Sequence, residues 1–281
     1  VAPSQGVHVV VDRDFLPGEH ALLVPKTADG RVLFAVPWLG KLVLGTTDTP
    51  RSDLPREPRP SRAELDFILG EAARYLARAP TRADVRSIWV GLRPLVRPAG
   101  DDEDTATLSR EHTVMVSPAG LVTVTGGKWT TYRAMAEDVL ARCFQAGLLP
   151  EKPAGVSEQL KLVGSEMAGS APSSALSAPA GLHIYGSEQT LLQALPGAGQ
   201  VLTPGLDEAM VRFAARYEYA LTVEDVLARR SRLLFLDAAL AASLAPRVAA
   251  ILAEETGRDP ALAGFLGLAR GYLSWPSERD A

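Results

Sequence analysis

The chain has 281 residues, of which 47% are hydrophobic and 22% are charged, and its formal net charge is −4. This length favours two domains over one, and the composition is that of a globular protein. The negative charge and the lack of a basic run argue against nucleic-acid binding. A single cysteine, Cys143, excludes an intrachain disulfide and a cysteine-based zinc site, and we expect it to be a buried, inert thiol.

No apolar run approaches the roughly 20 residues that a membrane-spanning helix needs. The stretch richest in Ala and Leu, residues 238–253, is interrupted by Pro246 and Arg247. The chain starts at Val1 rather than Met and shows no signal-peptide pattern, so we expect a fragment of a longer protein.

Residues 7–46 carry the pattern of an antiparallel β-meander. Asp29-Gly30 stands between two apolar runs, which is a strong hairpin signal, and Leu39-Gly40 predicts the next turn. Strands joined so tightly must be antiparallel. We expect strands at 7–11, 20–26, 31–38 and 41–46.

A helix is predicted to follow the proline-rich loop at 51–60. Ser61 fits its N-cap, with Glu64 as the capping-box partner. The predicted buried stripe consists of Leu65, Ile68, Leu69, Ala72, Tyr75 and Leu76. Further on, we expect a strand at 85–91, an acidic turn at 101–105, and a hairpin of strands 113–116 and 121–125.

The second half differs in composition. Residues 164–181 are mostly Ser, Ala, Gly and Pro, so they bury too little to offset chain entropy, and we expect a flexible linker or long surface loop open to proteases. Helices are expected at 206–219, 222–236, 243–256 and 259–273. The predicted fold class is α+β, with a mainly antiparallel sheet backed by helices in a domain at 1–150, followed by a small all-helical C-terminal domain at 151–281.

The segment from Thr125 to Arg133 combines a glycine pair, a lysine and a helix start. Helical spacing of the apolar residues from Tyr132 onward indicates a helix, with Thr130 or Thr131 as N-cap. The free N–H groups of its first turn, with Lys128 beside them, would face an anion or an electron-rich ring. For the glycine pair alone, an ordinary strand-turn-helix corner is the better explanation.

Three further segments stand in the same order, and at similar spacing, in a known family: Leu44-Gly45-Thr46-Thr47-Asp48-Thr49, Gly91-Leu92-Arg93-Pro94-Leu95 and Thr107-Leu108-Ser109-Arg110-Glu111-His112-Thr113. Together with Gly126-Gly127-Lys128, they make the chain resemble the C-terminal half of the FAD-dependent glycerol-3-phosphate dehydrogenases and glycerophosphate oxidases. The resemblance extends from about Gly6 to the C-terminal helices. It implies FAD as cofactor and oxidation of sn-glycerol 3-phosphate to dihydroxyacetone phosphate by hydride transfer to flavin.

One feature of that family is missing from this sequence. The chain has no G-x-G-x-x-G between a strand and a helix with an acidic residue about 20 positions later. The AMP and pyrophosphate groups of FAD normally depend on such a turn. We therefore expect that residues 1–281 alone do not retain FAD.

The resemblance implies a role for each candidate site residue. His8 and Lys128 would be catalytic, with His8 as the base; the Arg93 and Arg110 guanidinium groups would bind the substrate phosphate, which suits their fork of donors. The cofactor contacts would be Gly126, Gly127, Lys128, Trp129 and Thr130. Arg93 is expected directly after the strand at 85–91. No pair of histidines has metal-ligand spacing, so no metal is expected.

Each of these roles has a structural alternative. A His on the second face of a strand is more often a hydrogen-bonded structural residue, and an Arg near a strand end is usually solvated. Trp129 fits core packing as well as a cofactor contact. Arg229-Arg230-Ser231-Arg232 could dock a partner or an anionic membrane surface, although a solvated helix face beside Glu224 and Asp225 is the preferred interpretation.

The resemblance also implies partners and a location. We expect quinone or oxygen as electron acceptor, a homodimer, and a bacterial cytoplasmic protein that is free or peripheral on the membrane. Two other functions stay open. One is a catalytically silent module that binds a phosphorylated ligand or partner without flavin, favoured by the missing fingerprint. The other is an amine oxidase of the same flavoprotein superfamily, against which the arginine-rich site argues.

Overall fold

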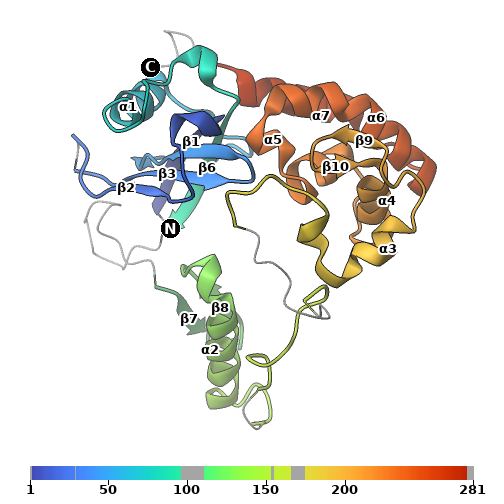
Figure 1. Ribbon diagram of the computed structural model, residues 1–281. Helices are drawn as coiled ribbons and strands as arrows, with labels where there is room; N and C mark the ends of the chain where they lie inside the picture. The colour runs from blue at the N-terminus through green and yellow to red at the C-terminus, as the bar shows by residue number, and fades with distance from the viewer. Residues whose placement is uncertain (1, 29, 96–110, 153–154, 166–174, 277–281) are drawn as a thin grey trace. The chain divides into compact units, whose positions relative to one another are not determined.

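The computed structural model describes residues 2–28, 30–95, 111–152, 155–165 and 175–276 (Figure 1). The chain divides into two units. The smaller consists of Val1–Gly6, Asp48–Pro58 and Gly91–Leu162, and the larger of Val7–Thr47, Arg59–Val90 and Val163–Ala281. Strands β1 and β6 pass from one unit into the other, and each unit is described by itself.

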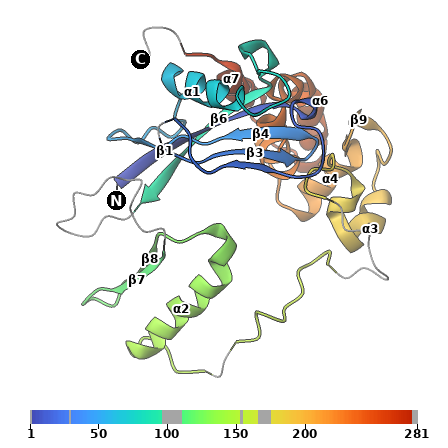
Figure 2. The same cartoon turned by 60° about the vertical axis from the view of Figure 1, so that its left-hand side comes forward.

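The larger unit contains the predicted antiparallel meander. Its strands are β1 (Ala2–Asp12), β2 (Leu22–Val24), β3 (Leu33–Trp38), β4 (Lys41–Gly45) and β6 (Ser87–Leu95). They follow the order β2-β3-β4-β1, and β6 also pairs with β1. Figure 2 shows β3, β4 and β1 side by side. Leu39 and Gly40, both at positive φ, make the predicted turn between β3 and β4.

Helix α1 (Arg62–Ala72) covers this sheet with the predicted capping box of Ser61 and Glu64. Leu65 and Ile68 are fully buried with Val7, Val9 and Val11 of β1 in one core cluster. The helix stops at Ala72, and of the predicted stripe Tyr75 is wrong because it is 44% exposed, whereas Leu76 beyond the helix is buried in the same cluster, as predicted. The same unit contains two 3₁₀ turns, η1 (Arg13–Phe15) directly after β1 and η2 (Arg82–Asp84) directly before β6.

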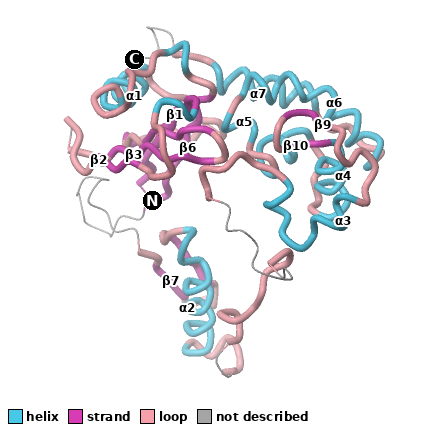
Figure 3. Tube along the Cα trace, viewed as in Figure 1, coloured by secondary structure: helices cyan, strands magenta, loops and turns pink. Residues whose placement is uncertain are grey.

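The C-terminal region is helical, as Figure 3 shows in cyan. It contains η4 (Leu182–Glu188), α3 (Gln189–Gln193), α4 (Glu208–Tyr217), a π-helical segment η5 (Asp225–Arg230), α5 (Leu233–Leu236), α6 (Ala238–Thr256) and α7 (Leu262–Leu273). A short antiparallel ribbon, β9 (Val201–Thr203) with β10 (Leu206–Asp207), interrupts this helical region, which the sequence did not predict.

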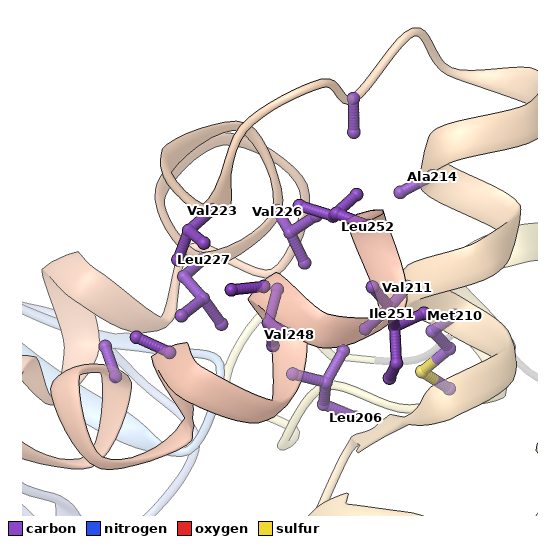
Figure 4. Close-up of a cluster of buried hydrophobic side chains, with 14 of the residues drawn as sticks. Leu206, Met210, Val211, Ala214, Val223, Val226, Leu227, Val248, Ile251 and Leu252 are labelled. Atoms are coloured by element: carbon purple, nitrogen blue, oxygen red, sulfur yellow. The ribbon is translucent and has the colours of Figure 1, made fainter. Parts of the chain in front are cut away.

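These helices enclose their own apolar core (Figure 4), in which Val211, Val248, Ile251 and Leu252 are fully buried. Helix α6 begins five residues before the predicted start at 243 and continues through Pro246. Asp237 caps its N-terminus by accepting a hydrogen bond from the Leu240 N–H at 3.0 Å. A proline inside a helix costs about 3 kcal/mol, and the buried face on both sides of Pro246 offsets that cost. No helix in the described ranges combines the length and the apolar character needed to cross a bilayer.

The end of the predicted linker lies on the sheet of the same unit. The N–H groups of Leu39 and Gly40 donate to the carbonyl oxygens of Leu176 and Ser177, at 2.8 and 3.0 Å. Ser177 is buried and its hydroxyl donates to Glu19. This part of the expected flexible linker is therefore anchored, whereas residues 166–174 lie outside the described residues.

The smaller unit contains the predicted hairpin of β7 (Thr113–Val116) and β8 (Val122–Thr125). A 3₁₀ turn, η3 (Trp129–Thr131), leads into α2 (Tyr132–Gln145), which packs on this hairpin. Strand β5 (Thr49–Pro50) pairs with the first residues of β1.

Cys143 of α2 is buried, as predicted. Much of the apolar surface here is exposed, including Met115, Leu121, Val124, Tyr132 and Leu140. The predicted acidic turn at 101–105 lies outside the described residues.

Candidate functional site

His8 lies on β1 with its side chain on the face opposite Val7 and Val9, as the alternation predicted. Its imidazole stacks on the Trp89 indole of β6, with ring centroids 4.1 Å apart and planes inclined by 14°. On the other neighbouring strand, His8 is paired with Gly45. A Cβ at Gly45 would lie 2.4 Å from His8 Cδ2, so glycine at this position leaves the room that the imidazole occupies.

A buried polar chain fixes the backbone next to His8. The Val7 N–H donates to Thr47 Oγ1 at 3.1 Å, and the Thr47 hydroxyl donates to Glu64 Oε1 at 2.9 Å. Both Thr47 and Glu64 are buried. Thr47 belongs to the Gly-Thr-Thr-Asp motif, so part of that motif serves to position β1.

Arg93 lies inside β6, not after its end, which corrects the sequence prediction. Pro94 does not terminate the strand, because a proline at a sheet edge needs no partner for its missing N–H. In the smaller unit, the Arg93 guanidinium lies over Gly6, where a Cβ would be 2.7 Å from Cζ. Asp48 Oδ1 forms an ion pair with Arg93 Nη1 at 3.3 Å. Ser4 donates a hydrogen bond to the same carboxylate oxygen.

The Gly126-Gly127 corner is packed tightly within the smaller unit. Both glycines have positive φ, 74° and 81°. A Cβ on Gly126 would lie 2.5 Å from the carbonyl oxygen of Glu111, and one on Gly127 would lie 2.6 Å from Met135 Sδ. His112 Nε2 lies 2.7 Å from Asp138 Oδ2 on α2, which also ties the start of the hairpin to the helix. The corner is thus rigid for reasons of local packing.

Lys128 and Trp129 are exposed at this corner. In the part of the chain that the structure describes, Lys128 forms no ion pair, while its carbonyl accepts from the Thr131 N–H and hydroxyl, both at 3.0 Å. Trp129 is 85% exposed and stacks on Tyr132, which excludes the core-packing alternative. Thr131 occupies the N-cap position of α2, but its side chain makes no capping hydrogen bond. Thr130 is exposed in the 3₁₀ turn.

Two family models match the chain. Residues 1–137 match the model described as FAD dependent oxidoreductase, and residues 155–263 match the C-terminal domain of alpha-glycerophosphate oxidase. A mitochondrial glycerol-3-phosphate dehydrogenase of Arabidopsis thaliana is 39% identical over 91% of this chain and 45% of that protein. The human mitochondrial glycerol-3-phosphate dehydrogenase is 35% identical over 92% of this chain and 38% of that protein. The chain belongs to the FAD-dependent glycerol-3-phosphate dehydrogenase family.

A solved structure supports the same assignment. The glycerol-3-phosphate dehydrogenase from Bacillus halodurans, a complex with FAD, superposes with a TM-score of 0.74 and 25% identity over 99% of this chain and 59% of that chain. The chain spans less than half the length of either curated relative described above.

The structure separates the candidate residues of this dehydrogenase-family chain between its two units. His8 belongs to the larger unit, and Arg93, Lys128 and the glycine corner belong to the smaller. Arg110 lies outside the described residues. Sequence reasoning missed Trp89 as the neighbour of His8 and Asp48 as the partner of Arg93. The Gly-Thr-Thr-Asp motif was a signal for Asp48, whereas only the pairing of β6 with β1 reveals Trp89.

The Arg229 to Arg232 run is a solvated helix face with local partners, which supports the preferred interpretation. Arg229 forms ion pairs with Glu224 and Asp225 of the same segment. Arg230 Nε lies 3.5 Å from Glu218 Oε2, and Arg232 donates to the Arg230 carbonyl at 2.9 Å.

Proposed function

We propose that this chain forms the substrate-binding and flavin-facing part of an FAD-dependent dehydrogenase that oxidises sn-glycerol 3-phosphate to dihydroxyacetone phosphate. Relatives that are named glycerol-3-phosphate dehydrogenase match more than nine-tenths of this chain, which supports the proposed substrate and reaction. The observation that carries the proposal is the corner at Gly126 to Trp129. At this corner, Lys128 forms no ion pair with any described residue, and the Trp129 indole is largely exposed at the start of a helical turn.

The residues at this corner fit an isoalloxazine ring. The main chain at Gly126 and Gly127 is partly exposed, and an exposed Trp129 offers an aromatic face. Lys128 and the first N–H groups of the helical turn together favour negative charge at this point. Bound FAD would supply the hydride acceptor, which no side chain can provide.

The remaining candidates would handle the substrate. His8 would take the proton from the C2 hydroxyl, since an imidazole titrates in the range that a general base needs. Arg93 and Arg110 would bind the phosphate dianion through charge-assisted hydrogen bonds. Asp48 would hold the Arg93 guanidinium in a fixed orientation over Gly6. Lys128 would stabilise the charge that develops during hydride transfer.

The wider properties of the enzyme are also proposals. We propose quinone or oxygen as the electron acceptor, a homodimer, and a cytoplasmic location, free or peripheral on the membrane. A bacterial source is likewise a proposal. The exposed apolar side chains around α2 support the expectation that the 281-residue chain alone does not retain FAD, because this surface lacks cover from its own unit.

The test uses the complete polypeptide, expressed from the natural reading frame that contains this chain. The purified protein should bind FAD, and glycerol 3-phosphate should bleach the flavin absorbance in a rapid-mixing experiment. Lys128→Met should lower both kcat and the rate of flavin reduction by roughly 10² to 10³, the usual loss for one preorganised electrostatic donor. Lys26→Met, at an exposed lysine of the larger unit, is the control and should keep both rates.

A protein that binds no FAD would instead support the catalytically silent module. Normal reduction rates in Lys128→Met would make the corner a structural feature without a catalytic role.

A further inference from the structure

A row of four aromatic rings links His8 to the C-terminal helices within the larger unit. The His8 imidazole stacks on Trp89 at 4.1 Å, and the Trp89 indole meets Phe235 of α5 edge-on, with centroids 5.7 Å apart and an interplanar angle of 85°. Phe235 in turn meets Tyr272 of α7 edge-on at 5.6 Å. Aromatic pairs prefer such stacked and edge-on geometries, so the rings favour one another's orientation.

The Trp89 indole depends on these ring contacts. Its Nε1 is buried and makes no hydrogen bond to any described residue. A buried indole N–H usually finds a partner that fixes the ring. Because the described chain supplies none, the ring contacts with His8 and Phe235 orient the indole without help from a hydrogen bond at Nε1.

Helix α5 holds Phe235 in register with β6. The Ser87 hydroxyl of β6 donates to the Leu234 carbonyl at 2.9 Å, and the Ala238 N–H donates to the Arg86 carbonyl at 3.1 Å. Ser87 and Leu234 are completely buried. These bonds lie on either side of Phe235 in the sequence, so the ring cannot shift along β6 unless one of them breaks.

We propose that the C-terminal helical region orients the base of the reaction, with Trp89 and Phe235 as positioning residues for His8. This inference rests on the proposed function, in which His8 takes the substrate proton. Phe235 would act through Trp89, whose face stacks on the imidazole and fixes its plane. A base must lie within hydrogen-bond reach and in line with the proton it removes, so a tilt of the ring slows the chemical step more than it weakens binding.

The substitution that tests this is Phe235→Leu, which keeps an apolar side chain against the helices and removes the ring edge. The matched control is Phe265→Leu in α7, which removes a buried ring from the same helical core without touching Trp89. Both are made in the complete polypeptide. Histidine labelled with ¹³C at Cε1 reports on His8, whose signal is identified by its loss in His8→Asn.

The ring current of an indole shifts the proton signals of an imidazole that stacks on it. The Trp89→Leu variant therefore shows the chemical shift of His8 without this stacking. Phe235→Leu should move the His8 signal toward this position and lower kcat by about 10- to 100-fold, with an unchanged KM for glycerol 3-phosphate. Trp89→Phe, which retains a ring, should restore most of kcat relative to Trp89→Leu. Phe265→Leu should leave the His8 signal and kcat as in the wild type.

An unmoved His8 signal in Phe235→Leu, or an equal displacement in Phe265→Leu, would overturn the inference. A displaced signal with wild-type kcat would also overturn it, because the helices would then orient the ring without consequence for the reaction. If His8→Asn itself keeps wild-type kcat, the role of His8 in the proposed function is wrong, and this outcome is distinct from the other two.

Discussion

Glycine is required at Gly126 for two separate reasons. Its φ of +74° lies in the left-handed region, and a Cβ would collide with a backbone atom, the Glu111 carbonyl oxygen. Gly147 follows α2 in the same unit with a similar φ of +69°, yet nothing lies within 4 Å of the position its Cβ would take. A comparison of the two glycines therefore separates the cost of a Cβ at positive φ, which both positions share, from the cost of the collision with the Glu111 carbonyl oxygen, which occurs only at Gly126.

We predict that Gly126→Ala destabilises the protein more than Gly147→Ala. The Gly147 substitution should cost roughly 1–2 kcal/mol, the usual penalty for a left-handed residue with a Cβ, and the Gly126 substitution should cost clearly more because the hairpin backbone must move as well. Urea unfolding of both variants provides the comparison. Equal losses would mean that the corner relaxes freely around an added methyl group.

At the scale of single elements, the η2 turn shows how a short segment is held by one carboxylate. Asp84 accepts hydrogen bonds from the Thr81 hydroxyl at 2.7 Å, the Thr81 N–H at 2.8 Å and Arg78 Nη1 at 3.1 Å. These donors, the Thr81 hydroxyl foremost, lower the pKa of Asp84 to about 2 from its ordinary 3.8. The folded state therefore prefers the ionised carboxylate more strongly than the unfolded state does.

A depressed pKa in the folded state contributes stability that is complete above the unfolded value and is lost as the pH falls through the folded value. We predict that Asp84→Asn lowers the free energy of unfolding at pH 6, and that its difference from the wild type shrinks between about pH 4 and pH 2. Urea unfolding at a series of pH values measures this difference. Thr81→Ser, which keeps the hydroxyl, should behave as the wild type. A difference independent of pH would exclude the carboxylate as its origin.

Elements with local signals could be predicted from the sequence. The capping box at Ser61, the turn at Leu39-Gly40 and the hairpin after Thr113 depend on residues close together in the chain, and the structure contains all three. The ribbon at 201–207 and the early start of α6 could not be predicted in this way. The first has only two short strands, and the second depends on Asp237 as a cap and on the buried face of α6 that Ala241, Ala245 and Val248 form, whereas Pro246 itself is exposed.

The candidate site follows the same rule. Alternation along β1 predicted the face of His8 correctly, because that pattern is local. The stack of His8 on Trp89 joins residues 81 positions apart, and the ion pair of Asp48 with Arg93 joins residues 45 positions apart. Both contacts depend on tertiary structure, which local sequence patterns do not predict. The roles of the site residues in catalysis stay predictions.

At the scale of the whole molecule, the sheet and the C-terminal helices of the larger unit share buried hydrogen bonds. We predict that Ser87→Ala costs about 1–3 kcal/mol of the free energy of unfolding, because it leaves the buried Leu234 carbonyl without its donor. Amide exchange should accelerate at Ala238, whose N–H donates to Arg86. Ser243→Ala removes an exposed hydroxyl that donates to the Leu240 carbonyl within α6 and should change stability by less than about 0.5 kcal/mol.

Chemical denaturation monitored in the sheet and in the helices should give one common transition for this unit. Two separated transitions, or equal effects of the two serine substitutions, would show that the helices do not depend on β6 for their stability.

The anchor of Leu176 and Ser177 on the turn at Leu39-Gly40 limits how far the helical region can travel. Only Ala178 to Gly181 lie between this anchor and η4, so the tether reaches at most about 18 Å when fully extended. If the bonds to β6 opened while the anchor held, the helices would stay at a local concentration on the order of millimolar and would rebind as an intramolecular reaction. Loss of the Phe235 contact that orients Trp89 and His8 would then be a brief hinge movement of the helices, and its frequency would not depend on protein concentration.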